Sequence, residues 1–304
     1  MVADAVPIAV PKARKYAWWR DYAAVIGIGV VLLLVLLAVF APYIAPHDPV
    51  IPALRLRLRP PVWMEGGSWT YVLGTDHLGR DILSRIIYGS RVSLIAGVAV
   101  VAIAGSFGTI VGLISGFVGG RVDTLMMRWV DVHIAFPGLL ISLLIIAVLK
   151  PSLGTVIIAL SINGWMVFAR LVRSIVLSAR QLPYVEAAEV IGCKPARTIF
   201  RHILPNLAAP LLTLAVLEFA RIVLAEAALS FLGVGIQPPA TSWGLDVASG
   251  RNYLFNAWWV VTLPGLAITI TVLGVNFLAG WLRVVVDPYE GEKRFARAVA
   301  NREA

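Results

Sequence analysis

Apolar and polar stretches alternate along this chain of 304 residues, and the apolar stretches have the length of a lipid bilayer. A helix of about 20 apolar residues crosses the ~30 Å hydrocarbon core. Six segments approach or exceed that length: 22–40, 92–117, 126–149, 153–171, 207–232 and 258–282. We expect a short turn at 118–124, and Pro137-Gly138 predicts a bend within 126–149. We therefore expect an all-α polytopic membrane protein with six transmembrane helices. Its predicted parts are a tail at 1–21, a first helix at 22–40, a polar segment at 41–91, a five-helix core at 92–286 with a loop at 174–206, and a tail at 287–304.

Composition supports a membrane protein and argues against a nucleic-acid-binding one. Hydrophobic residues make up 59% of the chain and charged residues only 14%, against roughly a quarter charged in soluble proteins. The net charge is +9, but Lys and Arg lie mainly at the ends of apolar segments and form no contiguous patch. The single cysteine, Cys193, cannot form an internal disulfide and gives no information on redox compartment.

The first apolar segment resembles a signal peptide, because basic residues precede it. It is longer than the usual 7–15 apolar residues, and Ala41-Pro42 follows where a cleavage site needs small residues without proline. We interpret 22–40 as an uncleaved first span.

The distribution of basic residues predicts the orientation. Of the 26 Lys and Arg residues, 17 fall in segments that this interpretation places inside, eight fall outside, and Arg221 lies within a span. Both termini are then cytoplasmic and 41–91 is extracytoplasmic, although the arginines of 41–91 argue against that position.

Residues 184–206, which we call the elbow, form a polar and basic island between two apolar segments. Good helix formers run from Tyr184 to Ile191, and Gly192 is suited to a left-handed helix cap. Pro195 is suited to the first turn of a second helix, which we expect to end near Leu204, before Pro205.

The elbow has the features of a docking surface. Ala187 and Ala188 have almost no side chain, so another backbone can approach closely. Lys194, Arg197 and Arg201 recur at helical spacing and predict a basic stripe on one face. An ordinary solvated loop between two spans is the competing interpretation.

Three groups inside the apolar segments also predict structure. Gly108, Gly112 and Gly116 share one helix face, which favours close packing of a neighbouring helix, although glycine is also generally tolerated in membrane helices. Arg128 and Asp131 are three residues apart and can pair, as can Glu218 and Arg221. Glu226 is an intramembrane polar residue, for which function or a partner is the usual explanation.

A compact motif precedes the second apolar segment, with Gly74, Thr75, Asp76, Gly79, Arg80 and Asp81. Two glycines, two aspartates and an arginine favour a tight turn held by charge-assisted hydrogen bonds. A metal site at Asp76, His77 and Asp81 is a weaker alternative.

Four motifs in order resemble the inner-membrane permeases of ABC importers, in the peptide/nickel branch, and in particular its second (C-type) subunit. Glu186-Ala187-Ala188, Gly192 and Leu204-Pro205 resemble the EAA loop, which in that family receives the cytoplasmic ATPase. His202 is a departure, because the loop usually has isoleucine there. The other three are the Gly74–Asp81 run, the stretch from Ala225 through Glu226 to Gly233, and the loop at 233–256.

The resemblance implies a type I permease fold in the bacterial inner membrane and an ATPase-coupling loop that includes Arg201. It also implies a heterodimer with a second related permease, two cytoplasmic ATPase subunits, an extracytoplasmic solute-binding protein and contact with membrane lipid. This chain would bind no cofactor, and ATP would be used by the partner subunits. No family role carries over to Glu218 or Arg221, and the solute stays open among dipeptides, longer peptides, nickel chelates and other small solutes.

The residues also leave two other function classes open. A secondary transporter or channel would need no ATPase, so its elbow would have no partner. An intramembrane hydrolase would depend on Glu226 and the polar residues around it, because the sequence has no HExxH, GxSxG or Walker A motif.

Overall fold

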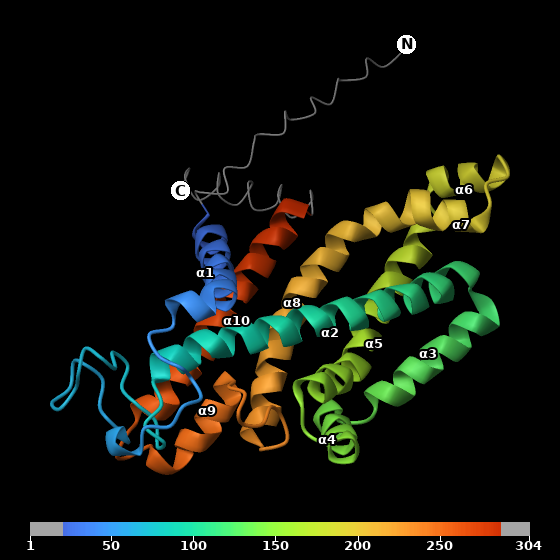
Figure 1. Ribbon diagram of the computed structural model, residues 1–304. Coiled ribbons are helices and arrows are strands. Elements are labelled where there is room, and N and C mark those ends of the chain that lie inside the picture. Colours follow the sequence, from blue (N-terminus) through green and yellow to red (C-terminus); the bar gives the residue numbers. More distant parts are fainter. Residues whose placement is uncertain (1–20, 287–304) are drawn as a thin grey trace, which may run out of the picture.

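The computed structural model describes residues 21–286, apart from the side chain of Glu189, and in this range the protein is a bundle of long helices (Figure 1). The expected tails at 1–21 and 287–304 lie outside the described residues, except for Asp21. The long helices are α1 (Tyr22–Ile44), α2 (Ile82–Val118), α5 (Leu153–Ala179), α8 (Leu204–Phe231) and α10 (Trp259–Val286). Shorter elements are α3 (Gly120–Ile134), α4 (Gly138–Leu149), α6 (Pro183–Val190), α7 (Pro195–Arg197), α9 (Trp243–Gly250), the π-helix η3 (Thr198–Ile203), and the 3-10 turns η2 (Leu54–Leu56) and η4 (Arg251–Tyr253).

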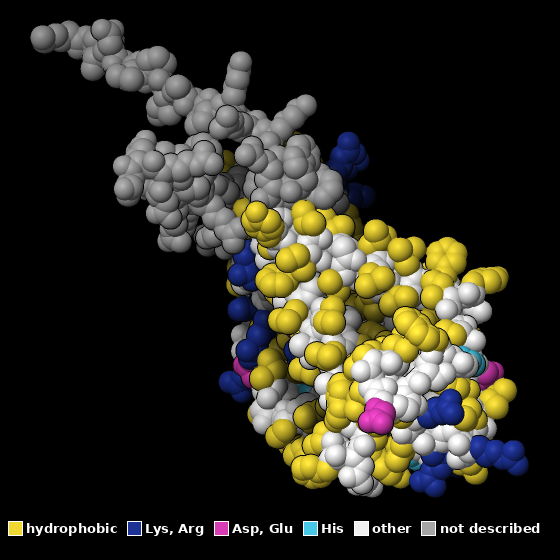
Figure 2. All heavy atoms as spheres, turned by 90° about the vertical axis from the view of Figure 1, so that its left-hand side faces the viewer, with side chains coloured by type: hydrophobic (Ala, Val, Ile, Leu, Met, Phe, Trp, Pro, Cys, Tyr) yellow, Lys and Arg dark blue, Asp and Glu magenta, His cyan; other side chains and the backbone are white. Residues whose placement is uncertain are grey.

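Five of the described helical stretches are long and apolar enough to cross a membrane, and there are six if α3 and α4 count as one broken span. Helix α5 is the central one, because 61% of its most apolar window is buried against 22% to 33% for the others. Hydrophobic side chains cover most of the face in Figure 2, and Lys and Arg side chains gather towards its lower end and left edge. This face therefore exposes the apolar side chains that contact with lipid requires.

Glycines bring α2 and α5 into backbone contact. A Cβ atom at Gly108 would lie 2.2 Å from the Trp165 carbonyl oxygen, and one at Gly112 would lie 2.6 Å from the Ala169 carbonyl oxygen. One turn further, Gly116 faces Val176 in the same way. The neighbouring helix on the glycine face is therefore α5 of the same chain.

Helix α2 begins at Ile82 and not at Val92 as expected. Asp81 caps it by accepting a hydrogen bond from the Ser84 N–H at 2.9 Å. The sequence predicted a polar segment up to residue 91, whereas Arg85 within it is helical, with a buried and ion-paired side chain. With 37 residues the helix is about 55 Å long, which exceeds the ~30 Å thickness of a hydrocarbon core.

The third expected span, 126–149, is two helices. Helices α3 and α4 meet at an angle of 82°, at the Pro137-Gly138 position where a bend was expected. Pro137 has no N–H to continue the helix and serves as the N-cap of α4. Helix α3 also starts earlier than expected and takes in most of what was expected to be a turn at 118–124.

Candidate functional site

The elbow has the predicted helix–Gly–helix form at its centre. Gly192 has φ +78° with open space around it, so the left-handed backbone alone favours glycine there. The Cys193 N–H donates to the Ala188 carbonyl oxygen at 3.0 Å, the cross-turn bond of a Schellman cap. Pro195 then occupies the first turn of α7, where its missing N–H is not needed.

The second elbow helix does not end at Leu204. Helix α7 continues through the π-helix η3 into α8, so Pro195 to Phe231 is one helical stretch. In η3 the Leu204 N–H donates to the Ile199 carbonyl oxygen, five residues back. This wider turn lies immediately before Pro205, which has no N–H to donate. The elbow is therefore joined to α8 without a flexible connector.

One face of the elbow is buried against the long helices. Val185, Ile203 and Leu207 form an apolar cluster with Leu113 of α2 and with Val172, Val176 and Ala179 of α5. Ala188 is buried, which corrects the expectation that both alanines lie on the docking surface. A displacement of the elbow must therefore be transmitted to α2, α5 and α8.

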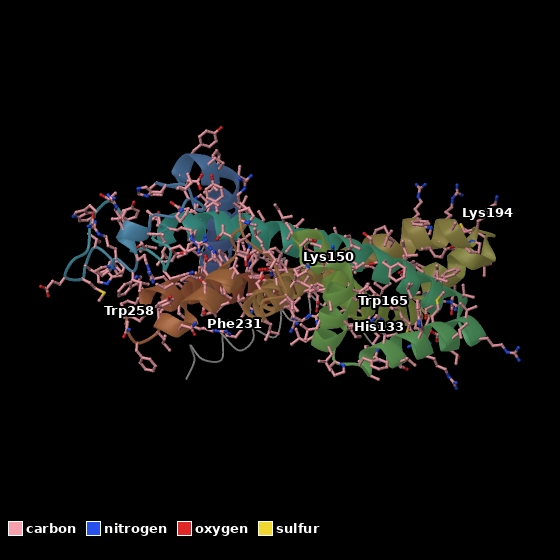
Figure 3. The ribbon with its side chains drawn as sticks, turned by 60° about the horizontal axis from the view of Figure 1, so that its bottom comes forward. His133, Lys150, Trp165, Lys194, Phe231 and Trp258 are labelled. Carbon is pink, nitrogen blue, oxygen red and sulfur yellow. The ribbon has the colours of Figure 1, made fainter. Side chains whose placement is uncertain are left out.

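The other face of the elbow is exposed. Glu186, Ala187, Arg201 and Pro205 lie on it, and Leu204 is half-buried. The predicted basic stripe of Lys194, Arg197 and Arg201 is exposed, and Figure 3 shows Lys194 at one extremity of the molecule. Large apolar side chains accompany these charges: Val190, Ile191 and Phe200 are 86%, 78% and 66% exposed. Basic and apolar groups on one rigid surface are the composition of a protein-binding face.

A polar cluster lies at the opposite end of the molecule, formed by residues 74–85 and α9, and we call it the α9 cluster (Figure 1). Gly74 and Gly79 have φ near +80°, and a Cβ atom at Gly79 would lie 1.9 Å from the Ala53 carbonyl oxygen. The Asp76 carboxylate accepts hydrogen bonds from the Leu78 N–H, the Arg80 N–H and the Arg80 Nε–H at 2.7 to 2.9 Å. The Thr75 hydroxyl accepts from the Arg59 N–H at 2.8 Å.

Arg85 ties this loop to α9. Its Nε–H donates to the Asp246 carboxylate at 2.7 Å and its Nη1–H donates to the Pro49 carbonyl oxygen at 2.9 Å. Burial raises the pKa of the Asp246 carboxyl, and the Arg85 guanidinium opposes that rise. Trp243 of α9 donates its indole N–H to the Ile86 carbonyl oxygen at 2.9 Å.

The carboxylates of the α9 cluster are used by this network. Asp76 binds Arg80, and Asp81 caps α2. His77 stacks on Tyr253 with ring centroids 5.8 Å apart, and burial lowers the pKa of its imidazole. Within residues 21–286 no group of three His, Cys, Asp or Glu side chains could hold a metal ion.

The charged residues of α8 have polar partners in the chain. Glu218 and Arg221 of α8 pair as expected, with the Arg221 Nη2 atom 2.6 Å from a Glu218 carboxylate oxygen. Glu226 is fully buried and accepts a hydrogen bond from the Ser230 hydroxyl at 2.8 Å. The Ser230 hydroxyl in turn accepts from the Ile236 N–H at 3.1 Å, which fastens the turn after α8.

The expected pair of Arg128 and Asp131 is wrong. Asp131 pairs with Arg170 of α5, and Asp123 of α3 pairs with Arg173, whose Nη2–H donates to it at 2.6 Å. Sequence reasoning considered only neighbours on one helix and so missed these pairs. Figure 3 shows His133 of α3 beside Trp165 of α5, 5.9 Å apart between ring centroids, so aromatic contacts join the same two helices.

Comparison with known proteins places these features in context. Residues 108–289 match the family described as binding-protein-dependent transport system inner membrane component. Residues 15–61 match the N-terminal TM domain of oligopeptide transport permease C.

Two relatives are similar over most of their length. The di/tripeptide transport system permease protein DppC of Pseudomonas aeruginosa (strain UCBPP-PA14) is 42% identical, covering 89% of this chain and 91% of that protein. The dipeptide transport system permease protein DppC of Escherichia coli (strain K12) is 42% identical, covering 92% and 94%. Among solved structures, an inward-facing MetNI methionine ABC transporter matches with a TM-score of 0.49 and 17% identity, over 64% of this chain and 94% of that chain.

Proposed function

Because the chain belongs to the family of inner membrane components of binding-protein-dependent transport systems, we propose that it forms half of the translocation path of an ATP-driven peptide importer. The names of the relatives favour dipeptides or tripeptides as the solute. The second half of the path comes from a second, related permease subunit.

The two-faced elbow carries this proposal. Its inner face is buried in an apolar cluster shared with α2 and α5, and its outer face carries exposed basic and apolar side chains. Such a part can receive a force from a partner and transmit it to the spanning helices. We propose that the partner is one of two cytoplasmic ATPase subunits, with Glu186, Ala187, Gly192 and Arg201 at or near the contact. ATP is then bound by the ATPases, and this chain binds no cofactor.

The orientation of the chain in the membrane indicates on which side the solute-binding protein acts. The excess of basic residues in the elbow and tails supports a cytoplasmic position for them in the bacterial inner membrane. In Figure 1 the ends of α1 and α10 that lead to the two tails lie in the upper part of the view, as the elbow does, and α9 lies in the lower part, which agrees with that orientation. The α9 cluster then faces the extracytoplasmic side, where a solute-binding protein delivers the peptide.

The mechanism is a rigid-body coupling. Closure of the ATPases on ATP displaces the elbow, and the displacement passes to α5, which precedes it, and to α8, with which it is continuous. These helices move, together with α2, relative to the partner permease and switch the path between outward-open and inward-open states. The chain's own residues supply docking, transmission and the path.

Charge reversal on the elbow tests the coupling. In the complete importer reconstituted in vesicles, Glu186→Arg should lower ATP-driven dipeptide uptake and ATPase co-purification about tenfold, as for loss of a charged contact in an interface. Glu65→Arg is the matched control, since Glu65 is an exposed acid outside the elbow. Normal uptake and normal ATPase binding in Glu186→Arg would overturn the assignment. Uptake that persists without any ATPase subunit would instead support a secondary transporter or channel.

A further inference from the structure

A cavity of about 210 Å³ lies between α4, α5 and α8. Its polar lining comes from Ser142 of α4, Asn163 of α5 and Arg221 of α8. The apolar lining comes from Leu139, Leu160, Ile222 and Ala225. A small cavity between spanning helices with a few convergent polar groups is the usual form of a ligand subsite.

Asn163 contributes an acceptor with no donor. Its amide nitrogen donates to the Gly138 carbonyl oxygen at 3.1 Å, the Ala159 carbonyl oxygen at 2.9 Å and the Ser142 hydroxyl at 2.8 Å. Two of these partners are carbonyls, which only accept, so the orientation of the amide is fixed. The Asn163 Oδ1 atom is buried and has no hydrogen-bond partner among the described residues. A buried acceptor without a donor is costly, which suggests that a ligand N–H occupies it at some stage.

Arg221 contributes donors that are held in place. Its Nε and Nη2 atoms bind one Glu218 carboxylate oxygen at 2.8 and 2.6 Å. A guanidinium has five N–H donors in a fixed fork, so its Nη1 side is left for another acceptor. The Glu218 side chain is only 9% exposed, whereas that of Arg221 is 53% exposed. Glu218 therefore orients the guanidinium and balances its charge.

The size of the cavity limits what it can hold. Pockets that enclose a whole drug-sized ligand have volumes of about 300–1,000 Å³, so about 210 Å³ accommodates one end of a solute. The N–H groups of Arg221 and the unpaired Oδ1 acceptor of Asn163 together match the C-terminal end of a peptide. Its carboxylate accepts hydrogen bonds, and its last amide N–H donates one.

We propose that this cavity is a transient subsite for the C-terminal end of a peptide during translocation, with Arg221 on the carboxylate and Asn163 Oδ1 on the last amide N–H. The inference rests on the proposed function. Because Glu218 neutralises Arg221, the subsite binds weakly enough to release the peptide, as a conducting path requires. Two of its walls, α5 and α8, are also the helices that carry the elbow, so elbow displacement changes the spacing of its polar groups.

The first test compares two solutes in the complete importer with its binding protein: dialanine and its C-terminally amidated form. The double variant Glu218→Gln Arg221→Gln keeps the pair uncharged and removes the cationic donor. Dialanine uptake should fall about tenfold, the loss expected for one hydrogen bond to a charged group, and uptake of the amide should change far less. An unchanged ratio of the two rates would overturn the subsite.

A milder variant tests Asn163 without disturbing its bonds to α4. A Cβ atom at Gly138 would lie 3.5 Å from Asn163 Oδ1, an ordinary contact that covers the acceptor without a clash. Gly138→Ala should slow dialanine uptake several-fold in a folded importer. Gly29→Ala on α1 is the control, because a Cβ there meets nothing within 4 Å. Equal uptake by both variants would contradict the role of Asn163.

The second test observes the cavity directly and needs no binding protein. In a Cys193→Ser background, Ala225→Cys places a thiol in the half-buried lining, and its reaction with a small methanethiosulfonate is timed. Dialanine should slow labelling more than its amide does. Equal rates with either solute would refute the subsite, whereas a wild-type importer without ATP-driven peptide uptake would refute the proposed function itself.

Discussion

The elbow and the α9 cluster lie at opposite ends of the molecule and are held together by different forces. In the α9 cluster, buried charges bind one another in fixed directions, and Arg85 joins Asp246 across 161 residues of chain. The elbow depends on apolar contacts, and the hydrogen bond from Asn206 to the Tyr184 hydroxyl, at 3.3 Å, is a weak addition.

This difference fits two mechanical tasks. Hydrogen bonds between buried charges lose their energy with small changes in angle, so they keep a shape. Apolar contacts are non-directional, so a surface held by them can shift while it stays buried. We therefore expect the α9 cluster to keep its shape during transport and the elbow to move with its partner.

Removing the buried pair of Arg85 and Asp246 in the α9 cluster should have the largest effect on stability. Arg85→Ala leaves Asp246 buried without its cation, which costs about 3–5 kcal/mol. We expect loss of folded protein in detergent, measured by thermal unfolding and by yield. The double variant Arg85→Met Asp246→Leu replaces the pair by apolar side chains and should recover most of the loss. A stable Arg85→Ala variant would remove the distinction between the two ends.

Disrupting the packing of α2 against α5, which lies between the two ends, should have the next largest effect on stability. At Gly112 a side chain meets the Ala169 carbonyl oxygen and the Val172 Cβ atom, at 2.6 and 2.7 Å from the Cβ position. Gly112→Leu should therefore destabilise the chain by about 1–3 kcal/mol through overpacking. The matched variant Gly29→Leu projects into open space, and an equal shift in melting temperature for both would contradict the α2–α5 packing argument.

A change in the elbow turn should have a smaller and more local effect. Gly192 has φ +78°, so Gly192→Ala introduces strain of about 1–2 kcal/mol. Peptide uptake and ATPase binding should fall while the α9 cluster stays intact. Gly192→Asn should restore both in part, because asparagine tolerates this conformation. Equal uptake and ATPase binding in Gly192→Ala and Gly192→Asn would show that the turn conformation is not required.

The smallest effect on stability is expected on the outer face of the elbow. Val190→Ser and Ile191→Ser alter side chains that are almost fully exposed. The free energy of unfolding, measured by thermal unfolding, should therefore change by no more than about 0.5 kcal/mol. ATPase co-purification should nevertheless fall. Val98→Ser on the exposed side of α2 serves as the control, and intact ATPase binding in both elbow variants would move the docking face elsewhere.

What could be predicted from the sequence follows the same division. The apolar lengths predicted α1, α5, α8 and α10, and the glycine and proline signals placed the turn at Gly192 and the break at Pro137. These features depend on neighbours within a few residues. The early start of α2, the pairing of Asp131 with Arg170 and the α9 cluster depend on partners far apart in the chain. No local pattern reports such distant partners, so the sequence predicted the pair of Glu218 and Arg221 within one helix but not the pairs between elements.

The broken helix pair has a consequence for how the chain enters the membrane. Helix α4 has 12 residues and so is about 18 Å long, too short to cross a ~30 Å hydrocarbon core by itself. The Asn163 side chain ties the first residue of α4 to α5 through the Gly138 carbonyl. We therefore expect α4 to insert during synthesis together with α5, as a hairpin. The Asn163 amide, which later lines the cavity, would first hold that hairpin together through its hydrogen bond to Gly138. Membrane insertion and transport would then both depend on the same side chain.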